Sequence, residues 1–186
     1  MDYKTGHVAS ELQNVYYGSK IQLYVYLLAV KELLNAEPVG AFYLSTRGGY
    51  NSKGRNVNFK GQIVGSNEAV EGLDTPLYTA IKGGEKLYSN IIPRMKLSIK
   101  EDGRVHATSK DFITEQQMQN ALDYVKELIV KAVEEIAQGY VEKTPLKKCS
   151  EYCLYREICG GAQYEDIRVL SSKASPTDYD KGEING

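Results

Sequence analysis

Two residues at the start of the chain, Asp2 and Lys4, could together support the cleavage of a phosphodiester bond. Side chains two positions apart on a β-strand point to the same face of the sheet. A carboxylate placed there can ligate a divalent cation such as Mg²⁺ or Mn²⁺. An ammonium beside it can orient the attacking water or stabilise charge on the phosphate in the transition state. The same pair also fits a solvated strand end, because such spacing is common in proteins.

A second pair, Gln22 and Tyr26, lies in a segment whose apolar residues recur at helical spacing. Residues four positions apart on a helix face the same way, so the two side chains share one side of it. A glutamine on a mostly apolar helix face fits a hydrogen bond to DNA or to a neighbouring metal site. It also fits a plain surface position, and the sequence leaves both interpretations open.

All the cysteines of the protein, Cys149, Cys153 and Cys159, fall within one short segment near the C-terminus. An odd number of cysteines in a reducing compartment argues against disulfides. Such crowding indicates metal ligation, although zinc and iron–sulfur sites usually take four protein ligands. Three unligated thiols are the alternative.

Composition sets the class of protein. The chain has 186 residues, 42% hydrophobic and 25% charged, which fits one soluble globular domain with a hydrophobic core. No stretch reaches the roughly 20 apolar residues that cross a membrane. The N-terminus lacks the layout of a signal peptide, so a cytoplasmic location is predicted. A net charge of −1 argues against a strongly basic DNA-coating protein but is compatible with a nuclease, whose metal site carries acidic groups.

Periodicity and turn residues predict the elements of the first half of the chain. We expect a loop over residues 7–17, then a helix over 21–34 that is capped by Gly18-Ser19 and ends at Asn35. A buried strand is expected over 39–46, followed by a long polar loop over 47–60.

The second half carries clearer signals. Helical turns are expected over 67–73, and a hairpin with an Asp-Gly turn is expected over 97–107. The strongest predicted helix, 115–138, begins with a capping box formed by Thr114 and Gln117. Its apolar stripe predicts a core-packing helix and consists of Met118, Leu122, Val125, Ile129, Val133 and Ile136. The polar composition of 171–186 predicts a disordered tail.

Taken in order, these motifs resemble a known group of nucleases. The run Asp-Tyr-Lys-Thr-Gly, the Gln-x3-Tyr of the next helix and the C-terminal cysteines are similar to the RecB-like iron–sulfur nuclease domains of the PD-(D/E)xK type. Within that group the chain is most similar to the C-terminal part of the nuclease domain in AddB, the second component of AddAB-type helicase–nucleases. The resemblance implies an α/β fold over 1–170. This would be an incomplete restriction-endonuclease-like core with helices flanking a mixed sheet and a cysteine cluster at 149–159.

The resemblance also implies a role for each motif. Asp2 would ligate Mg²⁺ or Mn²⁺, Lys4 would be the catalytic lysine, and Gln22 and Tyr26 would form the DNA-proximal motif behind the site. Three of the four ligands of a structural 4Fe–4S cluster would be Cys149, Cys153 and Cys159. The implied partners are DNA and an AddA-type helicase–nuclease subunit, and the implied process is the repair of double-strand breaks by recombination.

The chain departs from the family pattern at its beginning. The family's second metal-binding aspartate and fourth cluster cysteine lie upstream of the segment matched here, so we expect this chain alone to be inactive or nearly so. A stand-alone Cas4-like iron–sulfur exonuclease is one alternative, although the long segment 39–107 favours the AddB-like interpretation. A non-catalytic DNA-binding or assembly module and a zinc-binding structural domain are the others. Metal-dependent cleavage of DNA separates the nucleases from these two.

Overall fold

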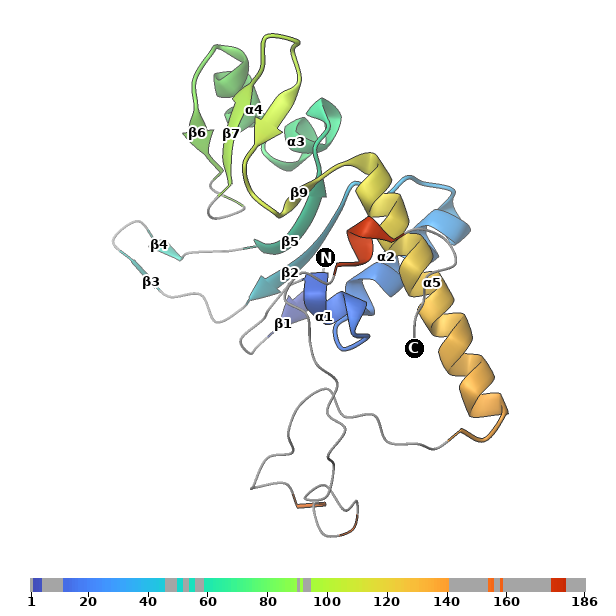
Figure 1. Ribbon diagram of the computed structural model, residues 1–186. Coiled ribbons are helices and arrows are strands. Elements are labelled where there is room, and N and C mark those ends of the chain that lie inside the picture. Colours follow the sequence, from blue (N-terminus) through green and yellow to red (C-terminus); the bar gives the residue numbers. More distant parts are fainter. Residues whose placement is uncertain are drawn as a thin grey trace.

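A mixed four-stranded sheet lies at the centre of the fold (Figure 1). The computed structural model describes residues 2–4, 12–45, 50–51, 54–55, 59–89, 91, 95–140, 154–155, 158 and 175–179. The helices are α1 (Leu12–Tyr16), α2 (Gln22–Leu34), α3 (Asn67–Leu73), α4 (Thr75–Lys82), α5 (Glu115–Ala137) and the 3₁₀ turn η1 (Pro176–Asp178). The strands are β1 (Asp2–Lys4), β2 (Gly40–Ser45), β3 (Tyr50–Asn51), β4 (Gly54–Arg55), β5 (Phe59–Val64), β6 (Leu87–Tyr88), β7 (Lys96–Ile99), β8 (Val105–Ala107) and β9 (Phe112–Ile113).

The central sheet has the strand order β1-β2-β5-β9. β1 pairs in parallel with β2, β2 pairs antiparallel with β5, and β5 pairs in parallel with β9. A parallel pair needs a crossover connection, and α2 is the helix that makes it between β1 and β2. The fold is therefore α/β with a mixed sheet, as the sequence predicted, and β1 is an edge strand among the strands described.

Alternating side chains on the strands serve two separate hydrophobic cores. Val64 and Ile113 join the core that the sheet forms with α2 and α5. Their neighbours in sequence, Ile63 and Phe112, join the core formed with α3, α4, β7 and β8. The sheet thus separates a helical layer from a second unit, inserted between β5 and β9 (Figure 1).

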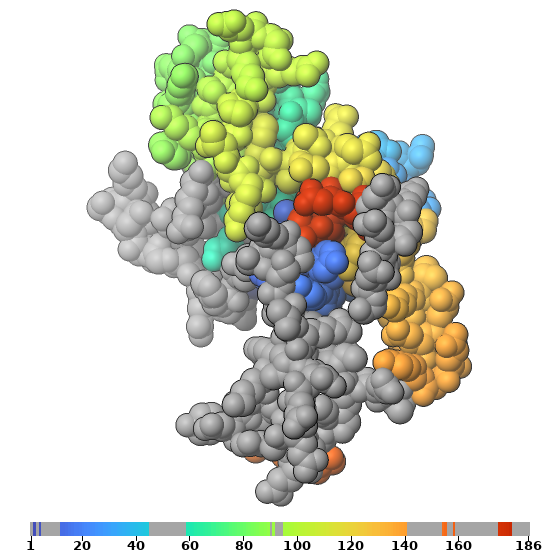
Figure 2. All heavy atoms as spheres, in the orientation of Figure 1, coloured from blue at the N-terminus to red at the C-terminus, as the bar shows by residue number. Residues whose placement is uncertain are grey.

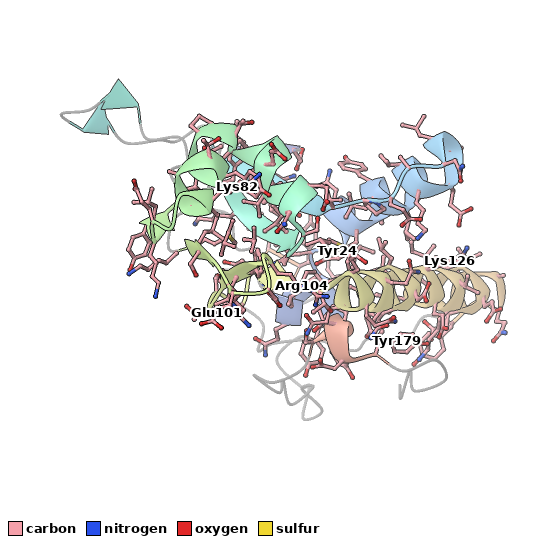
Figure 3. All side chains as sticks on the ribbon, turned by 90° about the horizontal axis from the view of Figure 1, so that it is seen from above. Tyr24, Lys82, Glu101, Arg104, Lys126 and Tyr179 are labelled. Carbon is pink, nitrogen blue, oxygen red and sulfur yellow. The ribbon has the colours of Figure 1, made fainter. Side chains whose placement is uncertain are left out.

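The inserted unit confirms two predicted elements and adds others. The side chain of Ser66 accepts a hydrogen bond from the backbone of Ala69, which starts α3 within the predicted range. β7 and β8 form the predicted hairpin, and Gly103 adopts a φ of +80° in its turn. The sequence did not predict α4. Lys82 at its end lies on the inserted unit with Glu101 and Arg104 of the hairpin turn (Figure 3).

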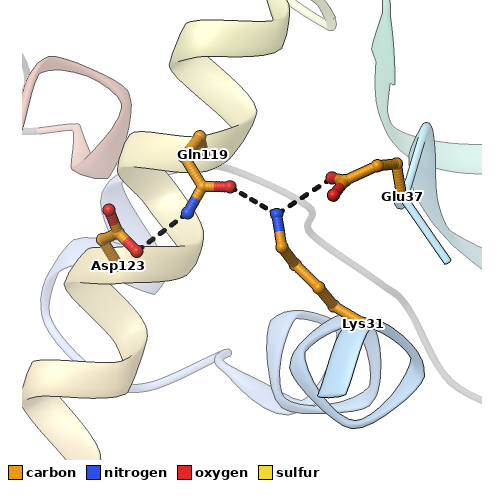
Figure 4. Close-up of polar contacts among 4 residues, drawn as sticks. All are labelled: Lys31, Glu37, Gln119 and Asp123. Carbon is orange, nitrogen blue, oxygen red and sulfur yellow. Dashed lines mark hydrogen bonds and ion pairs between the residues drawn. The ribbon is translucent and has the colours of Figure 1, made fainter. Parts of the chain in front are cut away.

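A polar network joins α2 to α5 (Figure 4). The Lys31 ammonium donates to Oε2 of Glu37 at 2.9 Å and to Oε1 of Gln119 at 2.7 Å. The amide nitrogen of Gln119 then donates to Asp123 at 2.8 Å. Because an ammonium only donates, it fixes which way the Gln119 amide is turned. This network and the shared core hold α2 at a fixed angle to α5, and α2 carries two of the site residues.

The long helix α5 matches its prediction at the start and departs from it toward the end. Thr114 and Gln117 form the predicted capping box. Met118, Leu122 and Val125 are buried, as the apolar stripe predicted. Val133 and Ile136 are 60% and 76% exposed, because α5 extends past the helices that pack on its first half. The last turns are therefore not part of the core described here.

The close pairing of β2 with β5 requires a glycine. A Cβ atom on Gly61 would lie 1.7 Å from the carbonyl oxygen of Ala41, closer than any side chain tolerates. Gly61 is paired with Phe42 in the antiparallel register. The sequence thus permits this approach at one position, which fixes the register of β2 beside the site strand.

Two predictions around the start of α2 are wrong. Residues 12–16, expected to be part of a loop, form α1. Ser19 does not cap α2: its hydroxyl donates to the carbonyl of Asn14, and the N-cap position is Ile21, without a side-chain hydrogen bond. The polar character of the segment hid a short helix because its few apolar residues, such as Val15, are the ones that are buried. The predicted end of α2 at Asn35 is confirmed by its left-handed conformation.

Two further segments differ from their predictions. Within the loop expected over 47–60, β3 and β4 form an antiparallel pair and β5 begins at Phe59. Within the tail expected to be disordered over 171–186, residues 175–179 form η1 and pack against α5. Pro176 and Thr177 are buried there despite the polar sequence around them. The predicted cysteine cluster lies outside the described residues.

We call residues 175–179 the strap. Asn120 of α5 donates to the carbonyl of Thr177 at 3.0 Å, and the hydroxyl of Tyr179 bonds to the carboxylate of Glu127. The ring of Tyr179 packs edge-on against Tyr124, which stacks in turn on Tyr16 of α1. Figure 2 shows the strap (red) beside the first half of α5 (yellow), and Figure 3 labels Tyr179 there.

Candidate functional site

Asp2 and Lys4 lie on the same face of β1, as their spacing predicted. The parallel register pairs Asp2 with Tyr43 and Lys4 with Ser45 of β2. The Nζ atom of Lys4 lies 2.8 Å from Oδ2 of Asp2, and the two side chains are 36% and 19% exposed. The acid and the ammonium therefore form an ion pair at the edge of the sheet, partly open to solvent.

The helix α2 places Gln22 directly over this pair. The Lys4 ammonium donates a 2.8 Å hydrogen bond to Oε1 of Gln22. The amide nitrogen of Gln22 donates to the hydroxyl oxygen of Tyr26 at 2.6 Å, one turn further along α2. Leu23, between them in sequence, is buried against Ala41 of β2, which anchors this part of the helix to the sheet. The structure thus brings Asp2, Lys4, Gln22 and Tyr26 together.

The hydrogen bonds of this group all run in one direction. An ammonium has donors only, so the oxygen of the Gln22 amide must face Lys4 and the nitrogen must face Tyr26. The Tyr26 oxygen is then an acceptor, which leaves its own proton directed elsewhere. Tyr26 is 47% exposed, so that proton faces the solvent side of the site.

The electrostatics of the site keep Lys4 charged. Its hydrogen bond to the Asp2 carboxylate raises the pKa of the Lys4 ammonium above its ordinary value, and this outweighs the opposing effect of desolvation. The face of the Tyr43 ring lies 5.5 Å from the same ammonium. Burial raises the pKa of Tyr43, so its phenol stays neutral beside the cation at neutral pH.

Asp2 alone does not make a magnesium site. Its buried Oδ2 atom has no hydrogen-bond partner among the described residues apart from the Lys4 ammonium, a position that suits a metal ligand. Mg²⁺ prefers six oxygen ligands and usually two anchoring groups. In the part of the chain that the structure describes, no group of three or more His, Cys, Asp or Glu residues could hold a metal ion. The described donor set therefore lacks at least one ligand.

The cysteines predicted to bind a cluster, Cys149, Cys153 and Cys159, lie outside the described residues. Their predicted role stays a prediction. None of the described helices is both long enough and apolar enough to cross a membrane.

Residues 1–160 match the family model described as "PD-(D/E)XK nuclease superfamily". The chain belongs to the PD-(D/E)XK nuclease superfamily. This confirms the predicted family, and the acidic residue and lysine of β1 are the pair from which it was predicted.

Several relatives of this nuclease chain are named as the second, or B-type, component of an ATP-dependent helicase/deoxyribonuclease. The protein of Caldanaerobacter subterraneus is 30% identical over 198 residues, which cover 93% of this chain and 16% of the relative. That of Clostridium botulinum is 29% identical over 182 residues, covering 86% and 15%. That of Lachnoclostridium phytofermentans is 26% identical over 200 residues, covering 93% and 17%. The chain thus spans about a sixth of the length of the relatives it matches, and they bear out the predicted similarity to AddB.

One residue of the nuclease site was not predicted. Tyr43 belongs to the expected buried strand, but the sequence did not mark it as part of the site. Its position follows from the register that pairs it with Asp2, and a register between strands this far apart cannot be derived from either strand alone.

Proposed function

We propose that this chain forms part of a metal-dependent DNA exonuclease domain in a helicase–nuclease that acts in double-strand break repair and recombination. The observation that carries the proposal is the Lys4 ammonium, held between the Asp2 carboxylate and the Gln22 amide in a chain of the PD-(D/E)XK superfamily. The names of the relatives, which combine helicase and deoxyribonuclease, support the larger assembly. An AddA-type helicase–nuclease subunit is the partner we propose.

In this proposal Asp2 is one ligand of a Mg²⁺ or Mn²⁺ ion, and a further protein ligand comes from a segment other than those described. When bound, such an ion would polarise the phosphodiester and lower the pKa of a bound water. Lys4 contributes a fixed positive charge beside the scissile phosphate, where it offsets the negative charge that develops in the transition state. Gln22 holds the ammonium in that position.

Tyr26 contributes a hydrogen-bond donor to the DNA backbone. Its oxygen accepts from Gln22, so its proton is free to be directed toward an anionic phosphate oxygen. A neutral hydroxyl donating to a charged oxygen is a stronger contact than one between two neutral groups. The proposed DNA-proximal role of the Gln22–Tyr26 pair therefore rests on the direction of one hydrogen bond.

A basic stretch next to the site supports DNA as the ligand. Residues 46–60 contain Arg47, Lys53, Arg55 and Lys60 and no acidic residue, in a chain whose net charge is −1. This stretch begins immediately after Ser45, which is paired with Lys4 in the sheet. Clustered positive charge of this kind binds phosphates independently of base sequence.

We also propose that the cysteines near the C-terminus bind a 4Fe–4S cluster together with a fourth ligand from elsewhere. Cys149, Cys153 and Cys159 supply three thiolates, and such clusters usually take four cysteines. The cluster would be structural. A brown protein with absorbance near 400 nm supports this, and a colourless protein loaded with zinc contradicts it.

The catalytic proposal is tested with the chain in two contexts. Alone, it should show no or almost no Mg²⁺-dependent cleavage of linear DNA, because the described residues offer one carboxylate for the metal. Placed in the Caldanaerobacter protein in exchange for the matching segment, it should restore cleavage. In that graft Lys4→Ala should lower the rate about 10²- to 10³-fold.

The control is Lys82→Ala on the inserted unit, which removes the same charge from a distant surface and should leave cleavage unchanged. A Lys4→Ala graft as active as the unmodified graft would overturn the proposed site. Cleavage by the chain alone that disappears in Lys4→Ala would overturn its proposed dependence on other segments.

A further inference from the structure

Tyr43 is placed at the site by the register of the sheet. It lies opposite Asp2 in the parallel pair of β1 and β2, on the face that carries Lys4 and receives α2. Its ring centroid is 5.5 Å from Nζ of Lys4, within the distance at which an aromatic face attracts an ammonium. The ammonium therefore has at least three neighbours, namely the Asp2 carboxylate, the Gln22 amide oxygen and the Tyr43 ring.

The ring is a rigid neighbour, unlike the other two. Tyr43 is 4% exposed and packs in one cluster with Leu23, Ala41 and Leu27. Such packing leaves a side chain in one rotamer. Lys4, by contrast, carries its charge on a flexible four-carbon stem, and Gln22 is exposed. A wall of fixed position limits where this stem can place the ammonium.

Chemistry at the site makes the position of the charge important. Small misplacements of a catalytic group lower rates strongly, since stabilisation of developing charge depends on preorganisation. An ion pair with Asp2 alone would let the ammonium move to either side of the carboxylate. The ring closes one of these sides, and Gln22 then sets the height of the charge above the sheet.

We propose that Tyr43 is a positioning residue for Lys4: its ring face holds the ammonium in line with Gln22. The catalytic part of this inference rests on the proposed function, whereas the geometric part does not. The aromatic face is the active element, so phenylalanine should replace tyrosine here and methionine, of similar size and without a ring, should not.

The geometric part is tested by NMR on the full chain. The methylene protons next to the Lys4 ammonium, assigned by their loss in Lys4→Arg, should be shifted upfield from those of exposed lysines by the ring current of Tyr43. The shift should persist in Tyr43→Phe and disappear in Tyr43→Met. Ordinary Lys4 resonances in the unmodified chain, or a shift that persists in Tyr43→Met, would overturn the inference, and the first outcome requires no variant to fold.

The catalytic part is tested in the graft described above. Tyr43→Met should lower kcat roughly 3- to 30-fold with little change in KM, because the lost contact acts on the transition state. Tyr43→Phe should retain kcat. Tyr78→Met is the matched control, since Tyr78 is 8% exposed in the other core and far from Lys4 in the fold. An equal loss in Tyr43→Phe and Tyr43→Met, or no loss in either, would contradict the role of the ring.

The two proposals fail separately. If Lys4→Ala leaves the graft fully active, the proposed function fails, while the NMR signature still decides the geometry. If Lys4→Ala abolishes cleavage but the Lys4 signature is absent, the nuclease assignment stands and the inference about Tyr43 fails.

Discussion

Lys4 on β1 donates a hydrogen bond of 2.8 Å to the side chain of Gln22, eighteen residues later at the start of α2. The bond links the strand that carries the acidic residue to the helix that crosses over the sheet. It also orients the Gln22 amide, since only the oxygen of the amide can face an ammonium. A charge on the strand thereby sets the direction of a hydrogen bond on the helix.

The direction of that bond can be tested by reversing it. In Gln22→Glu both side-chain oxygens accept, so Lys4 keeps its partner while Tyr26 must donate to the new carboxylate. We expect DNA affinity to fall about tenfold or more, as in Tyr26→Phe, because the donor to the phosphate is lost in both. Filter binding or fluorescence anisotropy measures this. In the double variant the two losses should not add; fully additive losses would show that the added charge acts alone.

The basic stretch next to β1 should appear in the salt dependence of DNA binding. Neutral substitution of Arg47, Lys53 and Arg55 by glutamine should weaken binding and flatten the slope of log affinity against log salt by up to roughly three. The control removes three charges from the inserted unit instead, at Lys82, Lys86 and Lys100. Equal slopes for the two triple variants would show that net charge matters and its position does not.

Alkaline pH should destabilise the protein through Tyr24. This residue is 1% exposed, and its hydroxyl donates to Gln62 of β5 at 3.2 Å in the interior (Figure 3). Burial raises the pKa of Tyr24 well above its ordinary value of 10.0. The unfolded chain then loses this proton at a lower pH than the folded chain. The contribution to stability is complete below pH 10 and is lost as pH rises from there toward the folded-state pKa.

Urea unfolding at neutral pH and at about pH 11 measures this effect. The fall in the free energy of unfolding between the two should be smaller in Tyr24→Phe than in the unmodified chain. Tyr88→Phe removes a phenol that is 62% exposed and should leave the fall unchanged. An identical fall in all three proteins would refute the role of Tyr24.

The strap should contribute measurably to stability. Tyr179→Ala removes a ring that packs on Tyr124 and a hydroxyl bonded to Glu127, and we expect it to lower the free energy of unfolding by about 2–4 kcal/mol. Tyr88→Ala, on an exposed tyrosine, serves as the comparison and should cost less than about 1 kcal/mol. Equal effects would mean that the strap is not held to α5 in solution.

The sequence predicted what local signals encode. The capping box at Thr114, the hairpin turn at Gly103 and the left-handed end of α2 at Asn35 depend on neighbouring residues, and all are present. The shared face of Asp2 and Lys4 follows from strand geometry alone. The family followed from the order of the motifs and is confirmed.

Features that depend on distant contacts could not be predicted in this way. Tyr43 reaches the site through a register between β1 and β2, and the strap is ordered by α5, far from it in sequence. Both lie in segments whose own composition points elsewhere, one to an ordinary core strand and the other to disorder. Tertiary packing overrides local preference at these positions.

The strap also determines the topology of the segment that carries the cysteines. Residues 141–174 leave from the end of α5 at Tyr140 and must return at Ser175, where the strap is docked on the first half of the same helix. Their ends are thereby tied together before any metal binds. The entropy of closing a loop is then lost on folding of the protein core, and assembly of a cluster within it would carry a smaller entropic cost than in an open tail. Release of the strap should therefore weaken metal retention even though no strap residue is a ligand.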